Sequence, residues 1–185
     1  MVAQTIPEDR PLTVEDFMSL PMDDGHLYEL LQGELILAPS PELNHQRIAR
    51  RLVVRIDPIV ERTAFGELFF APTAVVLSRN DVVEPDLFVI RSDQQSLATR
   101  HTFNGAPPIV FEVLSPSNRK VDLQRKALLY ANAGVEEYWM VDPEMRRILI
   151  QRLIDGKVDT EIYTSGSVRS TILPGFTIGI DELFS

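Results

Sequence analysis

Apolar residues recur with a helical period in one long segment of this chain, from residue 41 to about residue 63. Their spacing of three to four residues predicts a helix with one face in the core. Pro58 is expected to kink this helix or to end its first part, because proline removes a backbone hydrogen bond and clashes with the preceding turn. The predicted core face consists of Ile48, Leu52, Ile56, Ile59 and Val60.

Two further segments have helical patterns. Thr13 is followed three residues later by Asp16, a capping-box pattern that predicts a short helix over TVEDFMSL, ended by Pro21. A longer helix is predicted over about residues 118–133, and Gly134 is suited to end it.

The other apolar runs are short and have the composition of strands. HLYELLQGELILAP predicts a hairpin that turns at Gln32-Gly33, and the segment around Asp155-Gly156 predicts another. The runs between the two long helices, of which the last are VVEPDLFVI and PIVFEVLS, predict core strands. The resulting order is a helix, three strands, a helix and a strand, with hairpin extensions at both ends. It implies an α/β fold in which helices flank a mixed sheet.

Composition narrows the class of protein. A chain of 185 residues with 44% hydrophobic and 24% charged residues suits one domain, expected over residues 13–185 after a loose leader of residues 1–12. No apolar run approaches the roughly 20 residues that span a bilayer, so no membrane partner is expected. The chain has no cysteine and shows no signal peptide, which predicts a cytoplasmic protein without disulfides or a thiolate zinc site.

The net charge of −9 argues against a general polyanion binder. An acidic enzyme can still act on DNA if its positive charge is concentrated in one cleft. The alternative is that the excess of acidic residues only keeps the protein soluble.

Two acidic residues lie inside apolar, strand-like runs, where an uncompensated charge is costly. Asp86 follows Pro85 in VVEPDLFVI, and Glu112 lies 26 residues later in PIVFEVLS. One hard divalent cation could compensate both acids if their strands are neighbours, and the backbone carbonyl of Val113 could be a third ligand. Such a site indicates metal-dependent hydrolysis, with phosphodiester cleavage as the expected reaction.

This arrangement resembles the PD-(D/E)XK nuclease superfamily. There, a Pro-Asp pair on one strand precedes an acid-X-Lys triplet on the next. Pro85-Asp86 and Glu112-Val113-Leu114 follow that pattern, except that leucine stands where lysine is expected. Lys126, on the following helix, is the nearest residue that could place an ammonium at the same point. The order of elements also matches the αβββαβ core of that superfamily.

Within the superfamily, the chain is similar to the Uma-type restriction endonuclease family over about residues 28–142. The resemblance rests on YELLQGEL, HQRIARRL and FEVLSPSNRKVDLQRKALLYANAGVEEYWMVDP. It implies a restriction endonuclease-like fold and a DNA endonuclease that uses Mg²⁺ or Mn²⁺. The catalytic residues that it implies are Asp86, Glu112 and Lys126, with Lys126 as a water-orienting base or charge stabiliser. It also implies Glu29 as a weaker metal ligand.

Each candidate has a purely structural alternative. Asp86 could cap a turn, Glu29 could be a charge at a hairpin edge, and Lys126 could pair with Asp122 four residues earlier on the helix surface. Tyr130 is expected in the core, and the alternative is that its hydroxyl reaches the site.

Basic residues near the expected cleft could bind a phosphate backbone, or could form a solvated helix face. A histidine at the start of the first long helix could contact substrate phosphate or water, or could be a capping or solvent-facing residue. The candidates for substrate binding are His45, Arg47, Arg51, Arg119 and Lys120.

The sequence leaves a second function open. The leucine at position 114 and the acidic charge favour a catalytically inactive nuclease-fold module that binds nucleic acid or protein. A homodimer is expected for the endonuclease, because two sites about a two-fold axis can address the two strands of DNA.

Overall fold

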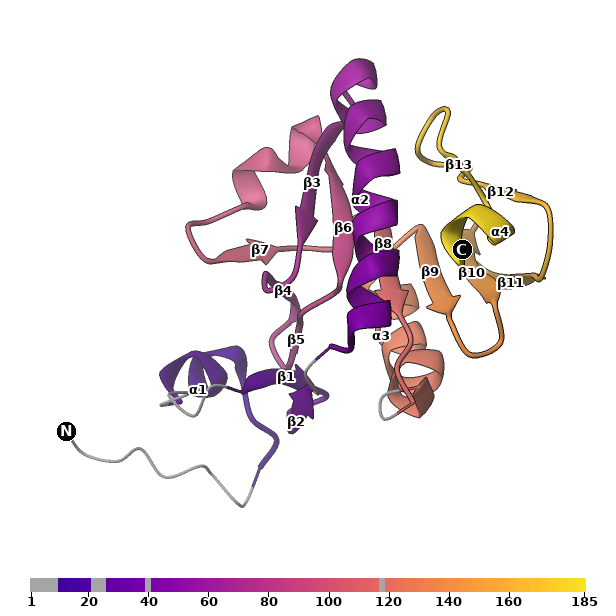
Figure 1. The fold of residues 1–185 in the computed structure, drawn as a ribbon. Helices are drawn as coiled ribbons and strands as arrows, with labels where there is room; N and C mark the ends of the chain where they lie inside the picture. Colours follow the sequence, from indigo (N-terminus) through magenta and orange to yellow (C-terminus); the bar gives the residue numbers. More distant parts are fainter. Residues whose placement is uncertain (1–9, 21–25, 39–40, 117–118) are drawn as a thin grey trace.

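The computed structural model describes residues 10–20, 26–38, 41–116 and 119–185. A six-stranded sheet runs in the order β11-β10-β9-β8-β6-β3, and a five-stranded sheet runs in the order β2-β1-β5-β4-β7 (Figure 1). The strands of the larger sheet are β3 Gly66–Phe70, β6 Leu87–Arg91, β8 Ile109–Val113, β9 Glu137–Asp142, β10 Arg147–Ile154 and β11 Lys157–Tyr163. Those of the smaller sheet are β1 Leu27–Leu31, β2 Glu34–Ala38, β4 Ala74–Ser78, β5 Asp81–Val83 and β7 Thr102–Asn104.

Helices and a short hairpin complete the fold. The hairpin pairs β12 Ser167–Arg169 with β13 Thr177–Gly179. The helices are α1 Val14–Ser19, α2 Leu43–Thr63, the 3₁₀-helix η1 Ser92–Leu97, the π-helix η2 Val121–Lys126, α3 Ala127–Ala133 and α4 Ile180–Leu183. Within the described residues, no helix is long and apolar enough to cross a membrane.

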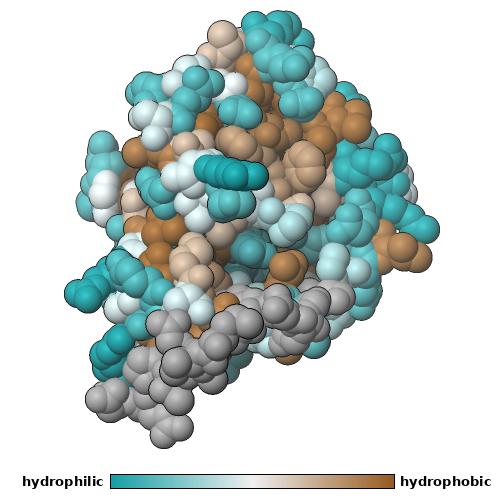
Figure 2. Space-filling model, turned by 90° about the vertical axis from the view of Figure 1, so that its left-hand side faces the viewer, coloured by the Kyte–Doolittle hydropathy of each residue, from teal (hydrophilic) through white to brown (hydrophobic). Residues whose placement is uncertain are grey.

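The two faces of the larger sheet are buried by different elements, because successive strand residues point to opposite faces. On one face, alternate residues of β6, β8 and β9 pack against α2 and the C-terminal segment. On the other face, the intervening residues pack against η2, α3 and strands of the smaller sheet. Figure 1 shows α2 lying across the larger sheet. In Figure 2, apolar residues gather in the middle of the visible face, among hydrophilic ones.

The predicted mixed α/β fold is confirmed, since β8 and β9 are parallel and the other pairs of the larger sheet are antiparallel. The predicted face of α2 is also confirmed, because Ile48, Leu52, Ile56 and Val60 are buried. The helix continues through Pro58 to Thr63, so the expectation that Pro58 ends its first part is wrong.

One prediction about strands needs correction. VVEPDLFVI is not one strand: it divides into β5 and β6, which belong to different sheets. Pro85 explains the division, because it has no N–H for a strand ladder. The predicted C-terminal hairpin is present as β10–β11, and it extends the larger sheet at one side.

The two predicted hairpin turns are present. Gln32 and Gly33 both have positive φ angles, of 55° and 77°. A side chain at position 33 would also lie 2.4 Å from Cβ of Pro11, so this turn requires glycine. This close approach of Gly33 to Pro11, with the hydrogen bond from the N–H of Leu12 to the carbonyl of Gly33, ties the segment before α1 to the smaller sheet. Leu12 is buried there. Residues 1–9 of the predicted leader lie outside the described residues.

Candidate active site

The break between β5 and β6 positions Asp86 beside Glu112. Asp86 directly precedes β6, and the antiparallel register that pairs Leu87 with Phe111 brings it next to Glu112 on β8. The backbone N–H of Val113 donates a 2.7 Å hydrogen bond to Oδ2 of Asp86. The two acids singled out from the sequence therefore converge at one edge of the larger sheet.

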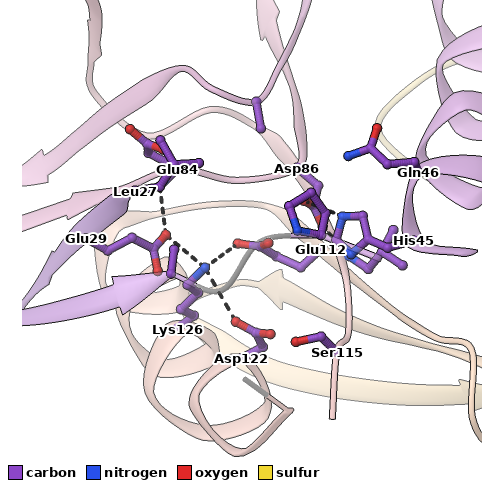
Figure 3. A pocket seen from close by; sticks show the side chains of 14 residues that line it. Leu27, Glu29, His45, Gln46, Glu84, Asp86, Glu112, Ser115, Asp122 and Lys126 are labelled. Atoms are coloured by element: carbon purple, nitrogen blue, oxygen red, sulfur yellow. Dashed lines mark hydrogen bonds and ion pairs between the residues drawn. The ribbon is translucent and has the colours of Figure 1, made fainter. Parts of the chain in front are cut away.

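Lys126 lies among the carboxylates rather than in solvent. It is 3% exposed, and its Nζ lies 2.9 Å from Oε1 of Glu29 and 2.9 Å from Oε1 of Glu112. Asp122 Oδ1 is 3.4 Å from the same nitrogen. Figure 3 shows the ammonium between these three side chains, which come from β1, β8 and η2. Lys126 thus supplies an amine that Leu114, buried in the core, does not.

The helix that carries Lys126 is wound as a π-helix from Val121 to Lys126, before α3 begins. π-Helical turns within α-helices are frequently found at functional sites. Both Asp122 and Lys126 are buried on this turn. The predicted i, i+4 pair of Asp122 and Lys126 exists, but it is buried in the site instead of lying on the helix surface.

Tyr130 and His45 complete the contacts of the two strand acids. The hydroxyl of Tyr130 donates a 3.0 Å hydrogen bond to Oε1 of Glu112, so this tyrosine is both in the core and in contact with the site. Nε2 of His45, from the first turn of α2, lies 2.8 Å from Oδ1 of Asp86. Asp86 is therefore held from two sides, by a ring nitrogen and by the backbone of β8.

Burial and mutual repulsion set the protonation of the site. Burial raises the pKa of Glu112 well above its usual range, against the attraction of Lys126, and repulsion from Asp122 raises it further. Burial likewise raises the pKa of Asp122 to about 6. For Lys126, burial alone would lower the pKa, but attraction to Glu112 and Glu29 raises it well above the usual value. Lys126 is therefore a fixed positive charge within an excess of acidic groups.

A hollow of about 100 Å³ opens onto these groups. Five carboxyl side chains line it: Glu29, Glu84, Asp86, Glu112 and Asp122. Three of them have a buried oxygen without a hydrogen-bond partner, namely Oε2 of Glu29, Oε2 of Glu84 and Oδ1 of Asp122.

These oxygens fit a hard divalent cation by their chemistry, since such ions prefer carboxylate and carbonyl oxygens. Among the described residues, no three histidine or acidic side chains already have the arrangement of a metal site. The ammonium of Lys126 lies where their negative charge is concentrated.

The structure brings one of the five predicted substrate-binding residues to this hollow. His45 lines it. Arg51 instead donates to the backbone carbonyls of Leu183 and Ser185. Arg119 forms a bidentate ion pair with Asp142 at the end of β9, with N–O distances of 2.6 and 2.5 Å. Arg47 and Lys120 are exposed. Whether these side chains contact substrate stays a prediction.

Two acidic residues of the site were not assigned to it from the sequence. Glu84 lines the hollow, and burial followed by repulsion from Glu29 raises its pKa. Its position directly before Pro85 was a usable signal, because a second acid there interrupts the same apolar run. Asp122 was interpreted only as a surface partner of Lys126, and its burial depends on the π-helical turn, which has no sequence signature.

Comparison with known proteins agrees with this geometry. A family model described as "Uma2: Putative restriction endonuclease" matches residues 14–181. The chain is also similar to a crystal structure of a "putative nuclease belonging to DUF820" from Anabaena variabilis, with a TM-score of 0.81 and 21% identity. That similarity covers 94% of this chain and 98% of the other, and at this identity it establishes the fold. None of the curated proteins compared with the chain matches it.

The family match extends over most of the chain, from α1 to the beginning of α4. It includes every residue of the hollow described above. The chain therefore belongs to the Uma2 family and has a restriction endonuclease-like fold.

Proposed function

We propose that this protein is a metal-dependent endonuclease that hydrolyses phosphodiester bonds in DNA, with Asp86, Glu112 and Lys126 as its catalytic residues. The observation that carries the proposal is the position of Lys126. Its ammonium lies 2.9 Å from Glu112, the acid of the Glu112-Val113-Leu114 triplet, although it comes from a different element than the lysine of the superfamily pattern.

A Mg²⁺ or Mn²⁺ ion would be held by the carboxylates of Asp86 and Glu112 and by the backbone carbonyl of Val113, with Glu29 as a weaker ligand. Such an ion, when bound, supplies Lewis-acid stabilisation of the phosphoryl oxygens and an acidified water. The buried oxygens of Glu29 and Glu84 that lack a hydrogen-bond partner support a cation in this hollow, because a buried carboxylate oxygen without a partner is costly.

The residues of the chain have separate tasks in this mechanism. Lys126 is ion-paired with Glu29 and Glu112, so it acts as a positive charge that orients the attacking water and stabilises the transition state, rather than as a proton acceptor. Val113 N–H and His45 fix the carboxylate of Asp86 from two sides. Tyr130 fixes the carboxylate of Glu112 from within the core.

The partner in this proposal is DNA, which His45, Arg47, Arg51, Arg119 and Lys120 were predicted to contact. We propose a homodimer, since two sites related by a two-fold axis can cut both strands. Light scattering during size-exclusion chromatography tests the dimer, and a strict monomer would contradict it. The lack of cysteine is in keeping with action in the cytoplasm.

The proposal is tested by incubating supercoiled plasmid DNA with the protein and Mn²⁺ or Mg²⁺. We expect nicking that stops when EDTA removes the metal and that falls by at least about 100-fold in a Glu112→Gln variant. Glu67→Gln is the matched control, because Glu67 is exposed on β3 and lines no part of the hollow. Equal activity of the wild type and Glu112→Gln at saturating Mn²⁺ would contradict the enzyme assignment.

The second candidate is an inactive nuclease-fold module, and the substitution of leucine at position 114 is the observation that favours it. Calorimetric titration with Mn²⁺ separates the two functions. The endonuclease requires binding that Glu112→Gln weakens, whereas a module that only binds a partner need not bind the ion.

A further inference from the structure

A second hollow, of about 150 Å³, adjoins the site on the other side of Asp86. It lies between the N-terminal half of α2 and the end of β3, and the two hollows share the lining residues His45, Gln46, Ala71 and Asp86. The remaining lining residues of the second hollow are Ala49, Arg50, Val53, Phe70 and Leu87.

Phe70 presents an aromatic ring at this hollow. It is the last residue of β3 and pairs with Leu87, the residue after Asp86. Its side chain is 60% exposed, whereas the preceding Phe69 stacks on Phe88 inside the core with ring centroids 5.2 Å apart. The backbone N–H of Ala71 donates a 3.0 Å hydrogen bond to the carbonyl of Asp86. The backbone on either side of the exposed ring is therefore paired with the backbone that carries the proposed metal ligand.

Arg50 adds a positive charge that has no partner within the described residues. It is exposed on α2, as is Arg47, whereas two other arginines of this helix make contacts within the fold. Arg51 donates to the backbone of the C-terminal segment, and Arg55 pairs with Glu182. The guanidinium of Arg50 is thus available at the hollow, next to an aromatic ring and a proposed catalytic carboxylate.

We propose that this second hollow binds an unpaired nucleotide next to the scissile phosphate, with its base stacked on Phe70 and a phosphate paired with Arg50. The substrate class is then a single-stranded or locally unpaired DNA segment. This inference rests on the proposed function, because it takes the scissile phosphate to lie at Asp86 and Glu112.

The physical reason is that a base cannot stack on a protein ring while it remains stacked in a duplex. Proteins that bind unpaired strands combine aromatic platforms with positive charge along the backbone, and each base–aromatic stack contributes to affinity independently of sequence. Enzymes that act on a duplex at such a site must first unstack a nucleotide, which favours substrates that are already unpaired. The net charge of −9 makes a local cation such as Arg50 more important for holding a phosphate.

The test measures binding without cleavage, in the Glu112→Gln background with Mn²⁺. The probes are an oligothymidylate that carries one 2-aminopurine, whose fluorescence reports stacking, and a blunt duplex of the same length. We expect tighter binding of the single strand, and a loss of about tenfold on Phe70→Leu with little change for the duplex. Phe70→Tyr keeps the ring and should retain the affinity. Arg50→Gln should make the slope of log affinity against log salt concentration shallower, by the amount expected for the loss of about one phosphate contact.

Leu128→Ala is the matched control, because Leu128 is similarly exposed but lies on α3. Equal single-strand affinity for Phe70→Leu and its parent, or tighter binding of the duplex, would overturn the inference, as would absence of binding to both probes. Circular dichroism verifies that each variant is folded. Failure of the proposed function would appear separately, as absence of metal-dependent cleavage of both the plasmid and the single strand by the wild type.

Discussion

Two buried glutamates on neighbouring parallel strands of the larger sheet have opposite environments. Glu112 lies near the end of β8, and Glu137 begins β9, where it pairs with Ile109. Both are almost completely buried. Because the strands are parallel, the two carboxylates lie at opposite ends of these neighbouring strands.

The carboxylate of Glu137 has a full set of donors. Arg152, Trp139 and Ser170 donate to it, and Thr171 donates through both its N–H and its hydroxyl. Burial alone would raise the pKa of Glu137, but the hydrogen bonds from Ser170 and Thr171 lower it below its usual value. Glu137 is an ionised group that fastens the C-terminal segment to β9.

The carboxylate of Glu112 has the opposite balance. Lys126 and Tyr130 bind one of its oxygens, while four other carboxyl groups line the same hollow. Burial raises the pKa of Glu112 well above its usual range. The comparison indicates that Glu137 is fully hydrogen-bonded and serves the structure, whereas Glu112 retains affinity for a proton, as its proposed catalytic role requires.

The largest effect is expected from Lys126→Met. The change leaves Glu29, Glu112 and Asp122 without a cation, which should lower the free energy of unfolding by about 3–5 kcal/mol at neutral pH. Nuclease activity should also fall by at least about 100-fold. Urea unfolding and plasmid nicking measure the two effects.

Lys157→Met, on the exposed edge strand β11, is the control for this change. If Lys126→Met were as stable and as active as this control, Lys126 would be neither the compensating charge of the cluster nor a catalytic residue. The stability loss should shrink in acid, because the carboxyl groups then become neutral.

The next prediction compares the two glutamates directly. Glu137→Gln should lower the free energy of unfolding by about 3 kcal/mol, because it removes the charge that its donors surround. Glu112→Gln should change it by less than about 1 kcal/mol, because the amide oxygen can still accept hydrogen bonds from Lys126 and Tyr130 and the neutral side chain removes the repulsion with Asp122. Chemical unfolding at pH 7 in EDTA measures both changes.

Activity should follow the reverse order. At denaturant concentrations well below its unfolding midpoint, the Glu137→Gln variant should retain the specific activity of the wild type. The Glu112→Gln variant should lose activity under the same conditions. Equal destabilisation by the two substitutions would refute the distinction between the two acids.

The sequence predicted the elements better than it predicted the environment of the site. The periodic stripe of α2 and the turn residues Gln32 and Asp155 depend on local interactions, and these predictions are confirmed. The division of VVEPDLFVI between two sheets depends on long-range pairing, and was not predicted although Pro85 allows it. The burial of Asp122 likewise depends on how η2 packs against β1 and β8, which no local pattern encodes.

A smaller effect is expected from pH. Burial raises the pKa of Asp122 from its ordinary value to about 6, so the folded state binds a proton that the unfolded state releases. The stabilisation is present below about pH 4 and is lost as the pH rises through about 6, with a size on the order of 2 kcal/mol. Urea unfolding in EDTA between pH 4 and 7 measures it.

Asp122→Asn serves as the comparison, because it cannot titrate and should give a flatter profile. Mn²⁺ should reduce the loss at higher pH, since the ion compensates the ionised carboxylates. Parallel pH profiles for the wild type and Asp122→Asn would contradict the assigned protonation.

The smallest effect is expected from Arg51→Gln, which bears on the basic residues rather than on the acids. Arg51 donates to the carbonyls of Leu183 and Ser185, so its loss should lower the free energy of unfolding by about 1 kcal/mol. If Arg51 only fastens the C-terminal segment, the salt dependence of DNA binding should not change, whereas Arg50→Gln should lower it. A lower salt dependence for Arg51→Gln would instead show that Arg51 contacts phosphate, as the sequence predicted. The separation of structural and functional roles that distinguishes the two glutamates would then not hold for the arginines of α2, because Arg51 would have both roles.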